Sequence, residues 1–127
     1  MRTLNISGYK PSKSLETAIL TNREREALKT FVEGVRQSLG ENLVRIILFG
    51  SKARGKSKRG SDIDLLVIVR ERNIESSHGV YKAASRADLH WEVNISPKIY
   101  SLDEYQQRQE IGALLIKEVE KNGVLLT

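Results

Sequence analysis

Two short apolar runs constrain the fold of this chain most strongly. The first is VRIILF at residues 44–49, and the second is DIDLLVIV at residues 62–69. Both are rich in β-branched residues and too short for buried helices, so each predicts a buried strand. A polar stretch, residues 50–61, joins them. The sequence therefore predicts a sheet that contains both strands.

Apolar residues at helical spacing surround these runs and predict helices. The expected helices cover residues 22–39, 73–88 and 101–122, a third strand covers 91–100, and a few strand-like residues follow at 124–126. In the last helix the predicted buried stripe is Ile111, Leu114, Leu115 and Val119. This order predicts an α+β (α/β-like) domain over residues 21–127, with a small mixed β-sheet flanked by helices. Residues 1–20 show no period and are expected to form a flexible lead-in.

Length and composition exclude several classes of protein. The 127 residues suit one soluble domain, and the chain has no cysteine, which excludes disulfides, thiol nucleophiles and thiolate zinc sites. No apolar run approaches the roughly 20 residues that span a bilayer, and the first residues lack the apolar stretch of a signal peptide. These features exclude a membrane role, and a cytoplasmic protein fits them best.

The net charge of +5 comes from one place. Five cations fall within residues 52–59 without one acid, and elsewhere sixteen cations balance sixteen acids. A confined basic loop indicates a polyanionic ligand, such as nucleotide phosphates, nucleic acid or an acidic partner, or simply a solvated loop. No recognised nucleic-acid motif accompanies the charge, so nucleic-acid binding is ranked last among the candidate functions.

Gly50 and Ser51 follow the first predicted strand directly. Glycine allows the backbone to approach a ligand closely. A helical turn over residues 51–54 would direct free backbone N–H groups outward, where phosphate binds favourably. The hydroxyl of Ser51 could add one more hydrogen bond. Alone, Gly-Ser is a common turn.

Asp62 and Asp64 open the second predicted strand. Alternation places them on one face, about 6.5–7 Å apart along the strand. Two carboxylates on one face repel each other unless a cation or solvent lies between them. Hard oxygen ligands of this kind suit Mg²⁺, which takes one or two carboxylates together with substrate phosphates. The alternative is a strand end whose acids face water.

Gly50-Ser51, ten further residues and Asp62-x-Asp64 together resemble the signature of the DNA polymerase β-like nucleotidyltransferase superfamily. More narrowly, they resemble the minimal nucleotidyltransferases (MNT domains), which include antitoxins paired with HEPN-domain toxins. The residues Ala53-Arg54-Gly55 and the apolar strand after the acids agree with this family, and the chain end over residues 120–126 is similar. Two spaced motifs in the right strand contexts are much more specific than either alone.

The resemblance implies transfer of a nucleoside monophosphate, AMP from ATP, to an acceptor hydroxyl. It assigns nucleotide binding to Gly50 and Ser51, with Arg54 and Lys52 as supplementary cations. It assigns two Mg²⁺ ions to Asp62 and Asp64. The implied partner is a small helical HEPN-domain protein.

The family places a third carboxylate on a neighbouring strand, and here the sequence departs from it. Asn94 occupies the aligned position, and Glu92 lies two residues earlier. On the strand predicted over residues 91–100, Glu92 shares the face of Asn94, and it is the predicted third catalytic and metal-binding carboxylate. Asp88 is a less favoured ligand, because it belongs to the preceding helix.

Two alternatives to a protein-modifying enzyme stay open. One is a transferase acting on a small molecule of the aminoglycoside type, although such relatives usually carry a further helical domain. The other is a catalytically weak or inactive MNT-fold module that sequesters a partner, which the substitution by Asn94 favours.

Overall fold

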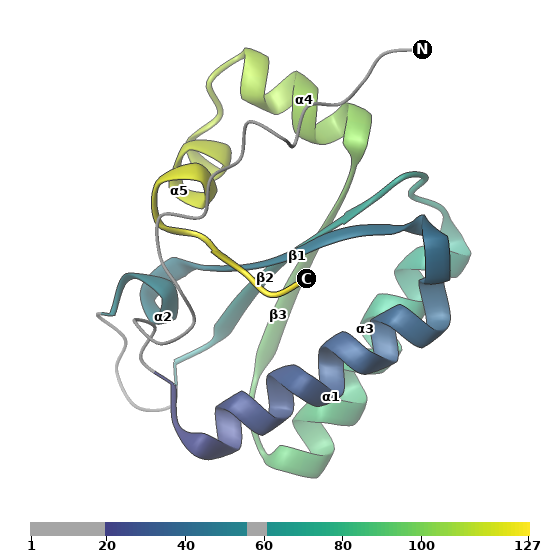
Figure 1. Ribbon diagram of the computed structural model, residues 1–127, viewed down its shortest axis with the longest axis vertical. Coiled ribbons are helices and arrows are strands. Elements are labelled where there is room, and N and C mark those ends of the chain that lie inside the picture. The colour runs from purple at the N-terminus through teal and green to yellow at the C-terminus, as the bar shows by residue number, and fades with distance from the viewer. Residues whose placement is uncertain (1–19, 56–60) are drawn as a thin grey trace.

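A computed structural model describes residues 20–55 and 61–127 (Figure 1). A mixed sheet of strand order β3-β2-β1-β4 lies at its centre. The elements are α1 (Asn22–Leu39), a 3₁₀ turn (Gly40–Asn42), β1 (Leu43–Phe49), α2 (Gly50–Arg54), β2 (Ile63–Val69), α3 (Ile74–Trp91), β3 (Ile95–Ser101), α4 (Leu102–Glu110), α5 (Leu114–Asn122) and β4 (Val124–Leu125). The predicted α+β class and small mixed sheet are confirmed.

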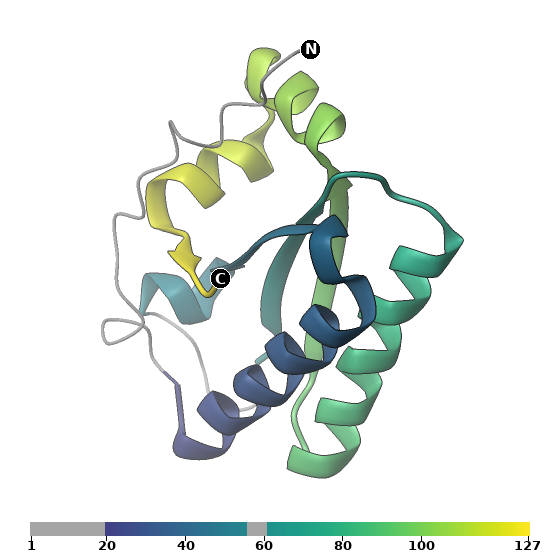
Figure 2. The same cartoon turned by 45° about the vertical axis from the view of Figure 1, so that its right-hand side comes forward.

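Two layers of helices enclose the sheet. β1 runs antiparallel to β2 and β4, whereas β3 runs parallel to β2 after the crossover through α3. Figure 2 shows α1 and α3 side by side on one face, with α4 and α5 on the other. Alternation along β2 serves both layers: Leu65 and Val67 belong to the core under α1 and α3, and Leu66 and Ile68 to the core under α4 and α5.

The helix expected over residues 101–122 is in fact two helices. α4 ends at Glu110, and Gly112 adopts a left-handed conformation with φ of +70° before α5 begins. The turn changes the direction of the chain, so the predicted buried stripe is wrong in part. Ile111 and Leu114 are 80% and 83% exposed, whereas Val119 is buried as predicted and Ile116 joins it.

The third strand also differs from the expected one. α3 continues to Trp91, and β3 begins only at Ile95. Residues 92–94 form the connection between them and do not alternate as a strand. No helix in the described part of the chain is long and apolar enough to cross a membrane.

Glu104 ties the start of α4 to the turn after β2. Its carboxylate accepts hydrogen bonds from Arg72 Nε at 2.7 Å and Nη2 at 2.8 Å, and from the backbone N–H of Ser101. The hydrogen bonds from Arg72 outweigh the opposing effect of burial and lower the pKa of Glu104 to about 2.

We expect acid to weaken the fold through Glu104. Because its folded pKa lies below the unfolded value of 4.5, its stabilisation is complete above that value and is lost as the pH falls toward about 2. The melting temperature of Glu104→Gln should be lower than that of wild type at neutral pH and should fall less on acidification. The exposed Glu71→Gln is the control and should follow wild type. Equal acid losses in Glu104→Gln and wild type would contradict this assignment.

Candidate active site

The pairing of β1 with β2 brings the two sequence motifs together. Phe49 pairs with Asp64, so Gly50, the next residue after Phe49, lies beside the Asp64 side chain. Gly50 is buried and has φ of +78°, a left-handed conformation that favours glycine. A Cβ atom at this position would collide with the carboxylate of Asp64. The glycine is therefore needed for the approach of the turn to the acid.

Helix α2 confirms the helical turn expected after the Gly-Ser pair. It begins directly at the end of β1, and its N-cap residue Phe49 provides no side-chain hydrogen bond. The first N–H groups of such a helix have no acceptor within it. Ser51 is half-buried and Arg54 is exposed, and residues three apart share one face of a helix. This end of the sheet therefore offers backbone donors, a hydroxyl and a cation together.

The charge of Asp62 acts on Asp64. Asp62 is exposed just before β2, and Asp64 is half-buried within it. Burial raises the pKa of Asp64, and the charge of Asp62 raises it further, while Lys98 and Arg54 partly offset the rise. The two carboxylates are therefore close enough to repel, and Arg54 is close enough to act on Asp64.

This pair suits a magnesium ion that a ligand also helps to hold. Mutual repulsion of two carboxylates is relieved by a cation, and Mg²⁺ commonly takes one or two carboxylates with substrate phosphates. Within residues 20–55 and 61–127, no group of three or more acidic or histidine side chains could hold a metal ion. The donor set therefore fits Mg²⁺ only with oxygen ligands from elsewhere, such as nucleotide phosphates.

Asn94 lies at the site, where the family pattern expects a carboxylate. Its side-chain Nδ2 donates a hydrogen bond of 2.6 Å to Asp62 Oδ1. Its backbone carbonyl accepts one of 2.9 Å from the N–H of Ile63. Asn94 thus holds Asp62 in place as a donor, a part that an ionised carboxylate could not play.

Glu92 does not occupy the position that the sequence predicted. It caps α3 in a left-handed conformation with φ of 54°, and its side chain is 83% exposed. Its carboxylate lies 3.6 Å from Arg23 Nη1. The prediction depended on strand alternation over residues 91–94, which the structure does not have. Glu92 therefore loses the geometric argument for a third metal ligand.

Lys52 also differs from its predicted role as a phosphate-binding cation. Its side chain is 3% exposed, and its Nζ lies 2.6 Å from Glu24 Oε2 on α1. The ammonium group points into the molecule because Lys52 lies on the inner side of α2. Lys56, Lys58 and Arg59, the other lysines and the last arginine of the basic loop, lie outside the described residues.

Sequence reasoning missed or undervalued two charged residues near the acids. Lys98 is exposed on β3, two residues after Ser96, which pairs with Asp64. Its charge offsets part of the rise in the pKa of Asp64. Asp88 accepts a hydrogen bond of 2.8 Å from the N–H of Ile95, and the charge of Asp62 helps to raise its pKa after burial. The parallel pairing of β2 with β3 was the missing information for Lys98.

We expect Gly50→Ala to destabilise the fold and displace Asp64. A side chain there meets both a left-handed backbone and a carboxylate, so unfolding should become easier by about 1–3 kcal/mol for the backbone alone, and more for the collision. Gly112→Ala is the matched control, since Gly112 has φ of +70° but only the flexible end of Lys117 nearby. Urea denaturation measures both. Equal losses would show that the contact with Asp64 carries no cost.

Comparison with known proteins places the chain. Residues 28–126 match the family model described as nucleotidyltransferase domain. Over 100 residues the chain is 37% identical to "Putative protein adenylyltransferase MJ0141" of Methanocaldococcus jannaschii. This alignment covers 78% of this chain and 94% of that protein. "Putative protein adenylyltransferase MJ1305" of the same organism is 37% identical over 73 residues, 55% of this chain and 50% of that protein.

Two solved structures share the fold. A crystal structure of a toxin–antitoxin with AMP-PNP has a TM-score of 0.58 at 19% identity, covering 84% of this chain and 73% of that one. A crystal structure of a mutant of the toxin–antitoxin MntA–HpeT has a TM-score of 0.55 at 17% identity, with the same coverage. The resemblance carried by Gly50-Ser51 and Asp62-x-Asp64 is thus confirmed by sequence and by fold, and this chain belongs to the nucleotidyltransferase domain family of enzymes.

Proposed function

We propose that this protein transfers AMP from magnesium-bound ATP to a hydroxyl group of a partner protein. The hydroxyl oxygen bonds to the α-phosphorus, the bond between the α- and β-phosphates breaks, and pyrophosphate leaves while the hydroxyl proton is lost. The observation that carries the proposal is the contact between the two motifs. The turn that offers phosphate donors lies directly against Asp64, one of the two carboxylates suited to the metal. A triphosphate bound by the turn would therefore meet the acids without any rearrangement of the sheet.

Different residues of this chain bind the triphosphate and the magnesium. The first backbone N–H groups of α2 and the hydroxyl of Ser51 hold the triphosphate, since a helix start favours anions. Asp62 and Asp64 hold magnesium, expected as two ions. When bound, magnesium neutralises charge on the phosphates and lowers the pKa of the acceptor hydroxyl. Positioning and electrostatics then account for most of the catalysis.

Arg54 is the cation of the site that can exchange its partner for a phosphate. Its Nη1 lies 2.7 Å from Glu118 Oε1 on α5, and both side chains retain some exposure. Burial opposes the charge of Glu118, but the hydrogen bonds from Arg54 and Asn122 outweigh it and lower its pKa. An exposed ion pair of this kind is worth about 0–1 kcal/mol. Phosphates can therefore compete with Glu118 for Arg54, whereas Lys52 is held inside.

The acceptor is proposed to be a protein for two reasons. Two relatives in sequence carry the name of putative protein adenylyltransferases, and two structures that share the fold are of toxin–antitoxin proteins. By the family resemblance, the partner is a small helical HEPN-domain toxin, with this chain as its antitoxin.

A second candidate is a weakly catalytic module that binds and sequesters its partner. The hydrogen bond from Asn94 to Asp62 favours it, because an amide donor occupies the place of the third carboxylate. An amide is neutral, so an ion on the acceptor side would be held less tightly than in the family pattern.

Incubation with labelled ATP, magnesium and candidate protein acceptors tests the proposed function. Wild type should label the acceptor, whereas Asp64→Asn should abolish labelling. Without metal the same variant should melt no lower than wild type, because burial and Asp62 already disfavour the charge of Asp64. Ser51→Ala should bind magnesium–ATP more weakly, and Asp103→Asn, in an exposed turn of α4, should behave as wild type. Labelling that survives in Asp64→Asn would contradict the assignment.

Asn94→Asp separates the two candidate functions. In the presence of chelator the new carboxylate should repel Asp62 and lower the melting temperature, since the donor is lost. With magnesium the loss should shrink, and the rate of transfer should rise because a third charged ligand is available. A removed metal-positioning group commonly changes rates about 100-fold, or about 2.7 kcal/mol of barrier. Turnover only in Asn94→Asp would favour the sequestering module.

A further inference from the structure

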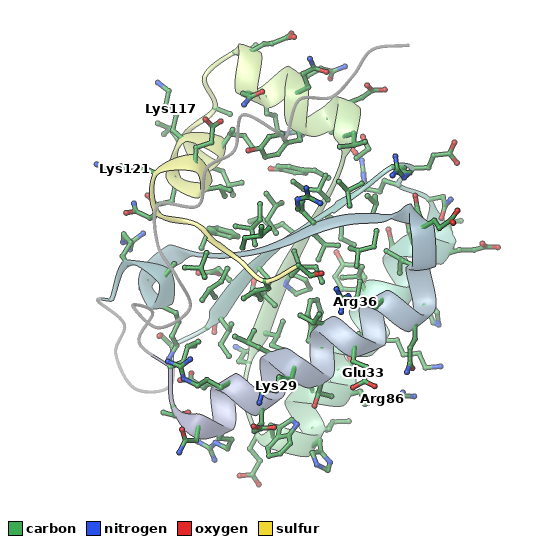
Figure 3. The ribbon with its side chains drawn as sticks, in the orientation of Figure 1. Lys29, Glu33, Arg36, Arg86, Lys117 and Lys121 are labelled. Atoms are coloured by element: carbon green, nitrogen blue, oxygen red, sulfur yellow. The ribbon has the colours of Figure 1, made fainter. Side chains whose placement is uncertain are left out.

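The ion pair between α1 and α2 is buried beside the proposed nucleotide site. Lys52 and Glu24 are 3% and 10% exposed, and their charged atoms lie 2.6 Å apart. Taking two charges out of water is costly, and such a pair is weak evidence for stability alone. Other charged residues of α1, Lys29 and Glu33, lie on its exposed side (Figure 3). Glu24 is therefore the exception that needs an explanation.

Glu24 serves two elements at once. Its Oε1 accepts a hydrogen bond of 2.9 Å from the backbone N–H of Thr21, which closes the capping box of α1. Its Oε2 forms the ion pair with Lys52 Nζ. Burial opposes its charge, but the hydrogen bonds from Lys52 and Thr21 outweigh burial and lower its pKa. Because the helix end fixes the carboxylate, the carboxylate in turn fixes Lys52.

Helix α2 needs such support from outside. It has five residues and no side-chain cap at its start, and isolated helices of this length are not stable in water. Lys52 and Ala53 are both buried, and they define its inner side. Ser51 and Arg54, three residues apart, then share another side. Because the residues of one helical turn rotate together, the directions of Lys52 and Ser51 are linked.

We propose that the pair of Glu24 and Lys52 positions the phosphate-binding turn. Lys52 is a positioning residue, because it sets the rotation of α2 about its axis and does not contact the nucleotide. The inference rests on the proposed function, since it assigns a role toward the same site. It places the determinant of nucleotide affinity partly on α1, at a residue outside both sequence motifs.

Titration with magnesium–ATP tests this inference in the full chain. The variants are Glu24→Gln, Glu24→Asp, Lys52→Met and the double variant Glu24→Gln/Lys52→Met. For each, the KM for magnesium–ATP and the kcat of transfer to the same acceptor are also measured. Gln retains an acceptor for the Thr21 N–H, and Met retains the apolar stem of lysine. Glu26→Gln is the matched control, because Glu26 forms an exposed ion pair with Lys29 on the same helix.

We expect Glu24→Gln and Glu24→Asp to bind magnesium–ATP about tenfold or more weakly, since small misplacements at a site cost large factors. The effect should fall on KM more than on kcat. The double variant should recover melting temperature relative to the single variants, because neither charge is left unpaired, yet should keep the weak binding. Glu26→Gln should bind as wild type.

Two results would overturn the inference. Wild-type affinity in the double variant would show that the pair only stabilises the fold. Unchanged or tighter binding in the Glu24 variants, with weak binding in Lys52→Met, would show that a released Lys52 contacts the phosphates directly. If the Lys52→Met protein fails to fold, Glu24→Asp and the double variant still decide between these results. Wild type that binds no magnesium–ATP would instead refute the proposed function.

Discussion

The antiparallel register of β1 and β2 is the constraint on which the site depends. With Phe49 opposite Asp64, the residue that leaves β1 must lie against a carboxylate, and only glycine fits there. A shift of one residue would turn every side chain of β2 to the other face. Asp64 would then enter the core under α1 and α3, where Leu65 now lies. Packing of the two apolar layers thus fixes the chemistry at the end of the sheet.

The two cations of α2 differ in how firmly they are held. Lys52 is buried on Glu24, whereas Arg54 pairs with Glu118 near the surface. A buried pair resists separation, because either charge left alone remains out of water. An exposed pair exchanges easily with solvent or with a ligand. One short helix therefore combines a buried, fixed lysine with an exposed arginine, which under the proposed function is available to phosphates.

The sequence predicted the elements that periodicity governs and failed where the chain changes direction. The strands over 44–49 and 62–69 and the first helix followed from apolar patterns. That Gly50-Ser51 and the acids belong to one site was implied only by the family resemblance. Glu92 was misplaced because the pattern over residues 91–100 also suits a strand, whereas α3 continues to Trp91 and Glu92 caps it. Lys52 was misplaced because a lysine in a basic loop gives no sign that a distant glutamate on α1 will pair with it.

Asn94 shows how a neutral substitution can stabilise a site and weaken its chemistry together. Two acids on one strand end repel, and the charge of Asp62 also reaches Asp88, where it adds to the rise in pKa that burial causes. A carboxylate at position 94 would add to this repulsion whenever metal is absent. The amide instead donates to Asp62, so the metal-free site is less strained. Asn94 in place of a carboxylate also removes a charged ligand, so the protein alone would hold a metal ion less tightly. Under the proposed function the metal and the nucleotide would therefore bind together, because the phosphates would supply oxygen ligands that the protein lacks.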